Sequence, residues 1–135
     1  MRWRNKNGGC LPAVLAGMLD VHPADIPGIS DQGELDWPVL NAWLADRDVT
    51  LQPVRARAGA SWGEVYPDGD WIALLDRGPN LAHAVHARRS TVIHDPGATD
   101  ARESWLSPGD FDRIRTDWNQ PLGYTLEPIN DPACI

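Results

Sequence analysis

The chain has 135 residues, of which 42% are hydrophobic and seven are tryptophan, a composition typical of one folded domain spanning residues 1–135 rather than of a disordered segment. Its net charge is −7 and it contains no basic stripe, so we expect no nucleic-acid partner, because binding phosphates requires clustered Lys and Arg. No stretch approaches 18 consecutive apolar residues, and we therefore expect no membrane span and no membrane partner.

The N-terminal residues resemble a secretory signal only in part. Three basic residues precede a mostly apolar run, but Pro12 and Gly17 interrupt that run and no small-x-small cleavage site follows it. We therefore expect a cytoplasmic protein. The two cysteines, Cys10 and Cys134, lie near opposite ends of the chain; we interpret both as free thiols in a reducing compartment, with a bridge between them as the alternative.

The first predicted element is a helix that begins near Cys10. Five apolar residues recur at the spacing of one buried helical face: Leu11, Val14, Leu15, Met18 and Leu19. Pro12 is tolerated in a first turn, where its missing N–H has no intrahelical partner in any case. Pro23 predicts that the helix ends near residues 20–21.

The position of Cys10 at the start of this helix gives its side chain a possible chemical role. A helix N-terminus favours a thiolate over a thiol, which makes the sulfur a better nucleophile. Gly8 and Gly9 leave space for a substrate backbone to approach. The alternative is a small apolar residue that opens a core helix.

A second helix is predicted to follow Asp36, which is typical of an N-cap, and to run to about Arg47. Its buried face comprises Trp37, Leu40, Trp43 and Leu44. Residues 49–54 alternate like a strand, and Pro53 makes that strand an edge. A short helix is possible over residues 61–65.

From Pro67 onward the pattern changes to strands. We predict strands at Trp71–Leu75, His83–Arg88, Thr91–Asp95 and Leu122–Leu126, with a tight turn near residues 89–90. The irregular stretch after Gly97 offers four packing anchors: Trp105, Leu106, Phe111 and Ile114. Two N-terminal helices followed by strands predict an α+β fold, with the helices packed on a mostly antiparallel sheet of roughly four to six strands.

The predicted hairpin brings a histidine and a carboxylate together. A turn centred near Arg89 sets His83 opposite Asp95, at a Cβ separation of roughly 4.5–5.5 Å. A thiol nucleophile requires such a pair, a base and a group that orients it. Pro96 ends the strand and leaves the carboxylate at an end of the sheet.

The same hairpin also suggests a metal site, since it holds His83, His86, His94 and Asp95. Strand alternation argues against this interpretation, because His83 and His86 point to opposite faces, as do His94 and Asp95. Neither a Cys-x-x-Cys nor a His-Glu-x-x-His spacing is present. We therefore expect no metal and no cofactor, structural roles for His86 and His94, and a turn role for His22.

Three segments resemble the papain-like cysteine peptidases, and among them the bacteriocin-processing (double-glycine leader) peptidases and similar stand-alone domains. CLPAVLAGML at residues 10–19 matches the family's cysteine-bearing helix, and DVHPADIP at 20–27 resembles the turn after it. HAVHARRSTVIHDPG at 83–97 resembles the family's His-Ala-Val … His-Asp-Pro hairpin. The resemblance runs from about residue 8 to residue 97 and implies a papain-like fold.

Carried over by position, the resemblance implies that Cys10 is the nucleophile, His83 the general base and then acid, and Asp95 the group that orients the imidazole. The chain departs from the family in one respect, because no glutamine precedes the cysteine to serve as an oxyanion donor. Asn5 or Asn7 is the substitute that the sequence offers, together with the backbone N–H of Cys10. Loss of one such donor typically costs on the order of 10²–10³ in rate.

The sequence thus favours a thiol-dependent hydrolase, a peptidase or amidase, or an acyltransferase, acting on a peptide or a small acyl or amide substrate through a Cys-His-Asp triad. A papain-like binding or inhibitory module without chemistry is the main alternative, because a fold does not dictate function. A metal-dependent hydrolase is the third hypothesis. The sequence does not indicate an oligomeric state.

Overall fold

The computed structural model describes residues 10–29, 35–55, 62–76, 82–96, 104–106, 108–111 and 121–129. The helices in these ranges are α1 (Cys10–Leu19), α2 (Trp37–Ala45) and α3 (Trp62–Val65), with short 3₁₀ helices η1 (Pro23–Asp25) and η2 (Pro108–Phe111). The strands are β1 (Val49–Val54), β2 (Asp70–Asp76), β3 (Ala82–Arg88), β4 (Thr91–His94), β5 (Ser104–Trp105) and β6 (Gly123–Pro128). The predicted α+β class is therefore confirmed for the described part of the chain.

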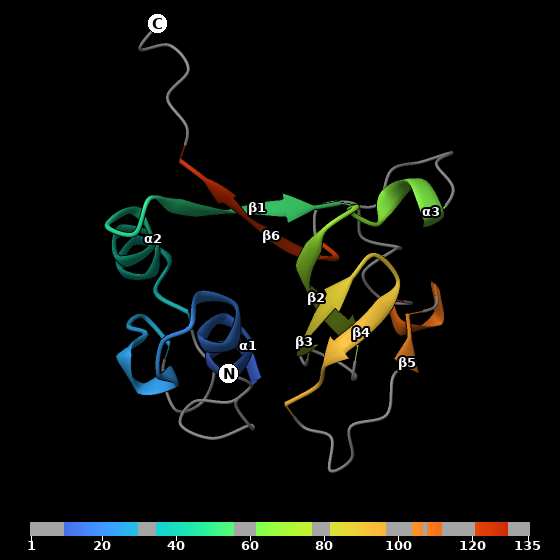
Figure 1. Ribbon diagram of the computed structural model, residues 1–135, viewed down its shortest axis with the longest axis horizontal. Coiled ribbons are helices and arrows are strands. Elements are labelled where there is room, and N and C mark those ends of the chain that lie inside the picture. Colours follow the sequence, from blue (N-terminus) through green and yellow to red (C-terminus); the bar gives the residue numbers. More distant parts are fainter. Residues whose placement is uncertain are drawn as a thin grey trace, which may run out of the picture.

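The described strands form one antiparallel sheet in the order β1-β6-β2-β3-β4-β5 (Figure 1). Pro53 lies on the outermost strand β1, as its missing N–H predicts. Leu122 ties the sheet together just before β6, because its N–H donates to the Val54 carbonyl at 2.6 Å and its carbonyl accepts from the Leu74 N–H at 2.8 Å. The last described strand, β6, thus lies between β1 and β2.

Alternate residues of β2 contribute to two hydrophobic cores, one on each face of the sheet. Ile72 packs toward α1 and α2, whereas Trp71 and Ala73 pack on the opposite face. The core on the helical face includes Val14, Leu15, Ala16, Ile26, Leu40, Leu44 and Ala84. The core on the other face includes Tyr66, Leu75, Val85, Ala87, Val92, Leu106, Phe111 and Leu122.

Helix α1 ends through its own backbone. Asp20 adopts a positive φ of 57°, and the N–H of Val21 donates to the carbonyl of Ala16 at 3.0 Å, which is the Schellman type of helix end. His22 then caps η1, because its Nδ1 accepts from the Ala24 N–H at 3.0 Å. His22 therefore has the turn role that the sequence predicts.

Helix α2 begins as the sequence predicts. Asp36 is its N-cap, and its side chain accepts from the Val39 N–H at 3.3 Å. Leu40 and Leu44 are fully buried, while Trp37 and Trp43 are half-buried against the same core. The helix stops at residue 45, about two residues before the predicted end.

The β3–β4 hairpin turns at residues 89–90, as predicted, with Arg89 at φ 51°. The indole N–H of Trp71 donates to the Arg89 carbonyl at 2.8 Å and so ties the turn to β2. The sequence does not predict β5, which has only two residues. Trp105 on β5 is 68% exposed, so its interpretation as a packing anchor is wrong.

The other predicted anchors have different outcomes. Leu106 and Phe111 are buried, as expected, because both join the core on the face opposite α1. Ile114 lies outside the described residues. Leu106 and Phe111 therefore pack against the sheet, whereas Trp105 on the edge strand β5 is exposed to solvent.

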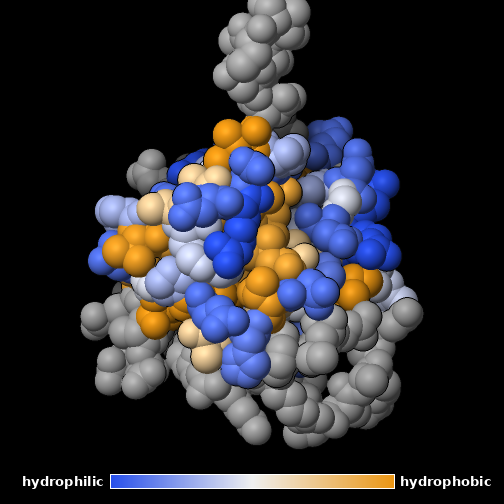
Figure 2. All heavy atoms as spheres, turned by 60° about the vertical axis from the view of Figure 1, so that its left-hand side comes forward, coloured by the Kyte–Doolittle hydropathy of each residue, from blue (hydrophilic) through white to orange (hydrophobic). Residues whose placement is uncertain are grey.

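The face that carries α2 has a mixed surface. Figure 2 shows hydrophobic groups on this face interrupted by hydrophilic side chains.

None of the helices in the described ranges has both the length and the apolar character needed to cross a bilayer.

Gly123 allows β6 to approach β2 closely. A Cβ at this position would overlap the carbonyl oxygen of Ile72, whereas a Cβ on Gly69 would meet nothing within 4 Å. We expect Gly123→Ala to lower the free energy of unfolding by about 3 kcal/mol, since β6 must move away from β2. Gly69→Ala is the control and should change it by less than about 0.5 kcal/mol. Urea denaturation measures both, and equal effects would contradict the close approach.

Candidate active site

Cys10 is the first residue of α1 and its side chain is half-buried against β3. The sulfur accepts a hydrogen bond from the backbone N–H of Ala84 at 3.1 Å. This hydrogen bond attaches the start of the helix to the strand. Cys10 is a free thiol, with no disulfide. Cys134 lies outside the described residues.

The N–H of Ala84 points toward Cys10 because of the sheet's hydrogen-bond pattern. Leu74 pairs with Ala84 in β2–β3 but gives its own N–H to Leu122 on the other side of β2. Leu74 and Ala84 are thus a non-hydrogen-bonded pair, and the N–H of Ala84 points away from β2. Because β4 pairs with β3 only as far as His94, the Cys10 sulfur takes the place of a strand carbonyl as acceptor.

His83 lies directly before Ala84 on β3 and contacts Asp95, which follows β4. The Nε2 atom of His83 lies 2.5 Å from Oδ1 of Asp95, a short hydrogen bond. The His83 side chain is 16% exposed and the Asp95 side chain 29% exposed, so both are partly shielded from water. The contact between imidazole and carboxylate that the sequence predicts is present.

The strand register that produces this contact differs from the predicted one. The regular hairpin predicted from the sequence sets His83 directly opposite Asp95. The ladder instead pairs Ala87 with Val92 and then His86 with His94, so that β4 holds one extra residue at a bulge. The prediction of direct pairing is therefore wrong.

The bulge at Ile93 determines which face of the sheet Asp95 points to. In a regular continuation of the ladder from the turn, Asp95 would lie opposite Ala84 and face away from His83. The extra residue shifts it to the position opposite Val85, which shares the face of His83. The carboxylate then reaches the imidazole diagonally across the hairpin.

The thiol and the imidazole shift each other's pKa in opposite directions. Burial alone raises the pKa of Cys10, but hydrogen bonds from the His83 side chain and the Ala84 N–H, together with the charge of His83, outweigh burial and lower it. The hydrogen bond to Cys10 raises the pKa of His83; burial opposes this, while the hydrogen bond and charge of Asp95 add to it. Both shifts favour a thiolate–imidazolium pair.

The two ring nitrogens of His83 have different partners. Nε2 is held by Asp95, so Nδ1 is the ring nitrogen left to interact with Cys10. A thiol, an imidazole and a carboxylate are thus neighbours, in the order that nucleophilic catalysis requires.

The remaining candidate residues do not join this chain of contacts. Nε2 of His86 lies 3.5 Å from Asp70, and His86 and His94 are paired on the face opposite to that of His83. In the described ranges, no three His, Cys, Asp or Glu side chains come together as a metal site would require. Asn5 and Asn7 lie outside the described residues.

Two features of the site are missed by sequence reasoning. A backbone donor such as the Ala84 N–H has no residue signature, because every non-proline residue carries one. The bulge at Ile93 has none either, since isoleucine is an ordinary strand residue. The early stop of β4 before Pro96 was the available signal for an unpaired N–H on β3.

Comparison with family models, with curated proteins and with solved structures found no match for this chain. The resemblance to papain-like peptidases therefore stays a hypothesis. The geometry of Cys10, His83 and Asp95 is what bears on function.

The lowered pKa of Cys10 predicts an unusual pH dependence of alkylation. In a Cys134→Ser background, iodoacetamide should modify Cys10 well below about pH 8.5, because the thiolate persists there. His83→Ala should shift the profile to higher pH, since burial then raises the pKa without the imidazole to oppose it. His94→Gln is the control and should leave the profile unchanged. Identical profiles for the starting protein and His83→Ala would contradict the ion pair.

The opposite shifts also predict how this pair contributes to stability. The lowered pKa of Cys10 adds its full amount to the free energy of unfolding above about pH 8.5, and this amount is lost as pH falls. The raised pKa of His83 adds its full amount below about pH 6.5, and this amount is lost as pH rises. Cys10→Ala removes both the thiol and the largest cause of the raised His83 pKa, so the unfolding free energies of wild type and Cys10→Ala should depend differently on pH. Urea titrations of both proteins across pH test this, and identical pH dependences would contradict it.

Proposed function

We propose that the protein is a thiol-dependent hydrolase or acyltransferase that uses Cys10, His83 and Asp95 as a catalytic triad on a papain-like fold. The observation that carries the proposal is the 2.5 Å contact between His83 Nε2 and Asp95 Oδ1 next to the half-buried Cys10, with the pKa of the thiol lowered and that of the imidazole raised. A cysteine kept only for packing has no need of such partners.

In the proposed mechanism the Cys10 thiolate attacks the carbonyl carbon of an amide, ester or thioester, and a carbon–sulfur bond forms. The protonated Nδ1 of His83 gives its proton to the leaving nitrogen, oxygen or sulfur as the original acyl bond breaks. Neutral His83 then takes a proton from water or from an amine, which attacks the acyl-enzyme. The thiolate is released, and the product is an acid or a new amide.

Asp95 orients His83 by holding Nε2, so that Nδ1 stays directed at the sulfur. The Ala84 N–H stabilises the thiolate before attack. The backbone N–H of Cys10 also lies against its own sulfur, which is where an oxyanion would form once a carbonyl carbon is attached. This N–H is the donor within the described residues that suits an oxyanion.

A papain-like arrangement is supported by the order of the elements. The cysteine opens the first helix, the histidine lies on a later strand, and the aspartate follows the next strand of the same hairpin. A peptide or a small acyl or amide compound is the substrate class that this chemistry suits. A binding module on the same fold would have no use for an activated thiolate, and the experiment below separates the two.

The proposal predicts unequal effects of substitutions on acylation by p-nitrophenyl acetate. The wild type should release p-nitrophenolate in a burst and carry one acetyl group on Cys10, detected by mass spectrometry. Cys10→Ala should abolish the burst. His83→Ala should slow acylation by about 10²-fold or more, and Asp95→Asn less, because the helix N-terminus and the Ala84 N–H still favour a thiolate.

His94→Gln is the control, since this imidazole lies on the opposite face, and it should acylate like wild type. All variants are first checked by thermal melting. A folded wild type that shows no burst and no acetyl adduct would support the binding module instead. If Asp95→Asn reacts like wild type, the triad reduces to the pair of Cys10 and His83.

A further inference from the structure

The N–H of Ala84 is available to Cys10 because the ladder between β3 and β4 ends before it reaches Ala84. The last pair of that ladder is His86 with His94, where β4 ends. Two positions further along both strands, the next hydrogen-bonded pair would join Ala84 to Pro96. The residue at position 96 therefore determines whether the Ala84 N–H is used within the sheet or by the sulfur.

A proline opposite Ala84 prevents this pair from forming. The N–H of Leu74 donates to Leu122, so Ala84 directs both its N–H and its carbonyl toward β4. An ordinary residue at 96 would donate its N–H to the Ala84 carbonyl and accept the Ala84 N–H at its own carbonyl. Pro96 has no N–H, and its ring would press on the Ala84 carbonyl in place of the missing hydrogen. Proline thus keeps β4 away from β3 at this point.

The bulge at Ile93 is what places the proline at this position. In a regular ladder from the turn, Pro96 would lie opposite His83, in a pair whose backbone groups point away from each other. A proline there would interrupt no bond, and the Ala84 N–H would donate to the carbonyl of Asp95. The extra residue moves Pro96 by one position, onto the pair with Ala84.

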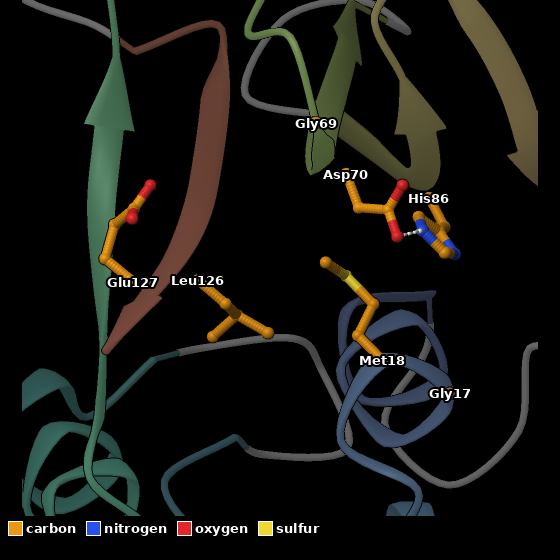
Figure 3. Close-up of a pocket in the computed structure, with 7 residues that line it drawn as sticks. All are labelled: Gly17, Met18, Gly69, Asp70, His86, Leu126 and Glu127. Atoms are coloured by element: carbon orange, nitrogen blue, oxygen red, sulfur yellow. Dashed lines mark ion pairs between the residues drawn. The ribbon is translucent and has the colours of Figure 1, made fainter. Parts of the chain in front are cut away.

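β3 itself stays on β2 through this region, so the break in the ladder results from the departure of β4. All seven residues of β3 pair with β2. The side chain of His86 also contacts Asp70 on β2 at 3.5 Å, the dashed line in Figure 3. Ala84 is 1% exposed, which shields its N–H from water as an acceptor. The N–H binds the Cys10 sulfur at 3.1 Å instead.

We propose that Pro96 is a positioning residue of the candidate active site: it ends the β3–β4 ladder opposite Ala84 and so reserves the Ala84 N–H for the Cys10 sulfur. Pro96 acts through the backbone of β3 and not on the reacting atoms. Its importance for the reaction rests on the proposed function, whereas the hydrogen bond that it controls can be measured without a substrate.

The test compares Pro96→Ala with the starting protein in the Cys134→Ser background. Alanine supplies the missing N–H, so the ladder gains a pair and the Ala84 N–H moves to the carbonyl of residue 96. The thiolate then loses a donor, and the pH profile of Cys10 alkylation by iodoacetamide should shift upward by about one pH unit. In ¹⁵N-labelled protein, the Ala84 amide signal should follow the Cys10 titration in the starting protein but not in Pro96→Ala.

Two further variants separate the hydrogen bond from other effects of the substitution, and all variants are first checked by thermal melting. Pro96 is buried, and Pro96→Val restores the N–H with a side chain close to proline in size, so it should act like Pro96→Ala. Pro53→Ala on β1, at the other side of the sheet in Figure 1, is the matched control and should leave both measurements unchanged. The shift should persist in an Asp95→Asn background, because Pro96 acts on the sulfur and not on the imidazole.

Three outcomes would overturn the proposal: an Ala84 signal that still follows the Cys10 titration in Pro96→Ala, a shift with Pro96→Ala but none with Pro96→Val, or a shift that disappears with Asp95→Asn. If the shifts occur but the starting protein shows no acylation burst, the proposed function is refuted and the role of Pro96 in holding the sulfur is confirmed.

Discussion

The hydrogen bond from the Ala84 N–H to the Cys10 sulfur determines where the start of α1 lies on the sheet. An N–H on a partly buried strand needs an acceptor, and a donor left without one costs roughly 1–3 kcal/mol. Since β4 leaves β3 before it can supply that acceptor, the first residue of α1 does so. The same contact brings the sulfur beside His83, the preceding residue of the strand. One contact thus positions both the start of α1 and the sulfur of the candidate site.

Much of the fold follows from the sequence because its signals are local. The spacing of apolar residues locates α1, the Asp36 cap begins α2, and the apolar run from Trp71 to Leu75 becomes the strand at the centre of the sheet. What the sequence could not supply depends on how strands meet. The order β1-β6-β2 requires a strand from the end of the chain to enter beside β2, and no local pattern encodes that choice.

In the candidate site, too, the sequence predicts local features but not those that depend on how strands pair. Residue types and order suffice to select Cys10, His83 and Asp95, because a nucleophile, a base and an orienting carboxylate are rare in that combination. Their contact, however, depends on a bulge that the regular hairpin does not contain. The predicted register and the observed one both place Asp95 on the face of His83, for different reasons. A correct pair of residues therefore emerged from an incorrect register.

Both ends of α1 lie where a strand ladder stops. At its start β4 separates from β3, and the freed N–H of Ala84 binds the sulfur. At its end β6 separates from β2, and the opening is lined by Met18 and Leu126. A continuous ladder satisfies its own backbone groups and leaves side chains facing a packed core or solvent. An interrupted ladder exposes polar groups at fixed positions on a rigid frame, which is the condition a binding or catalytic site needs. In this chain one helix covers two such interruptions, and the positive end of its dipole lies at the Cys10 sulfur.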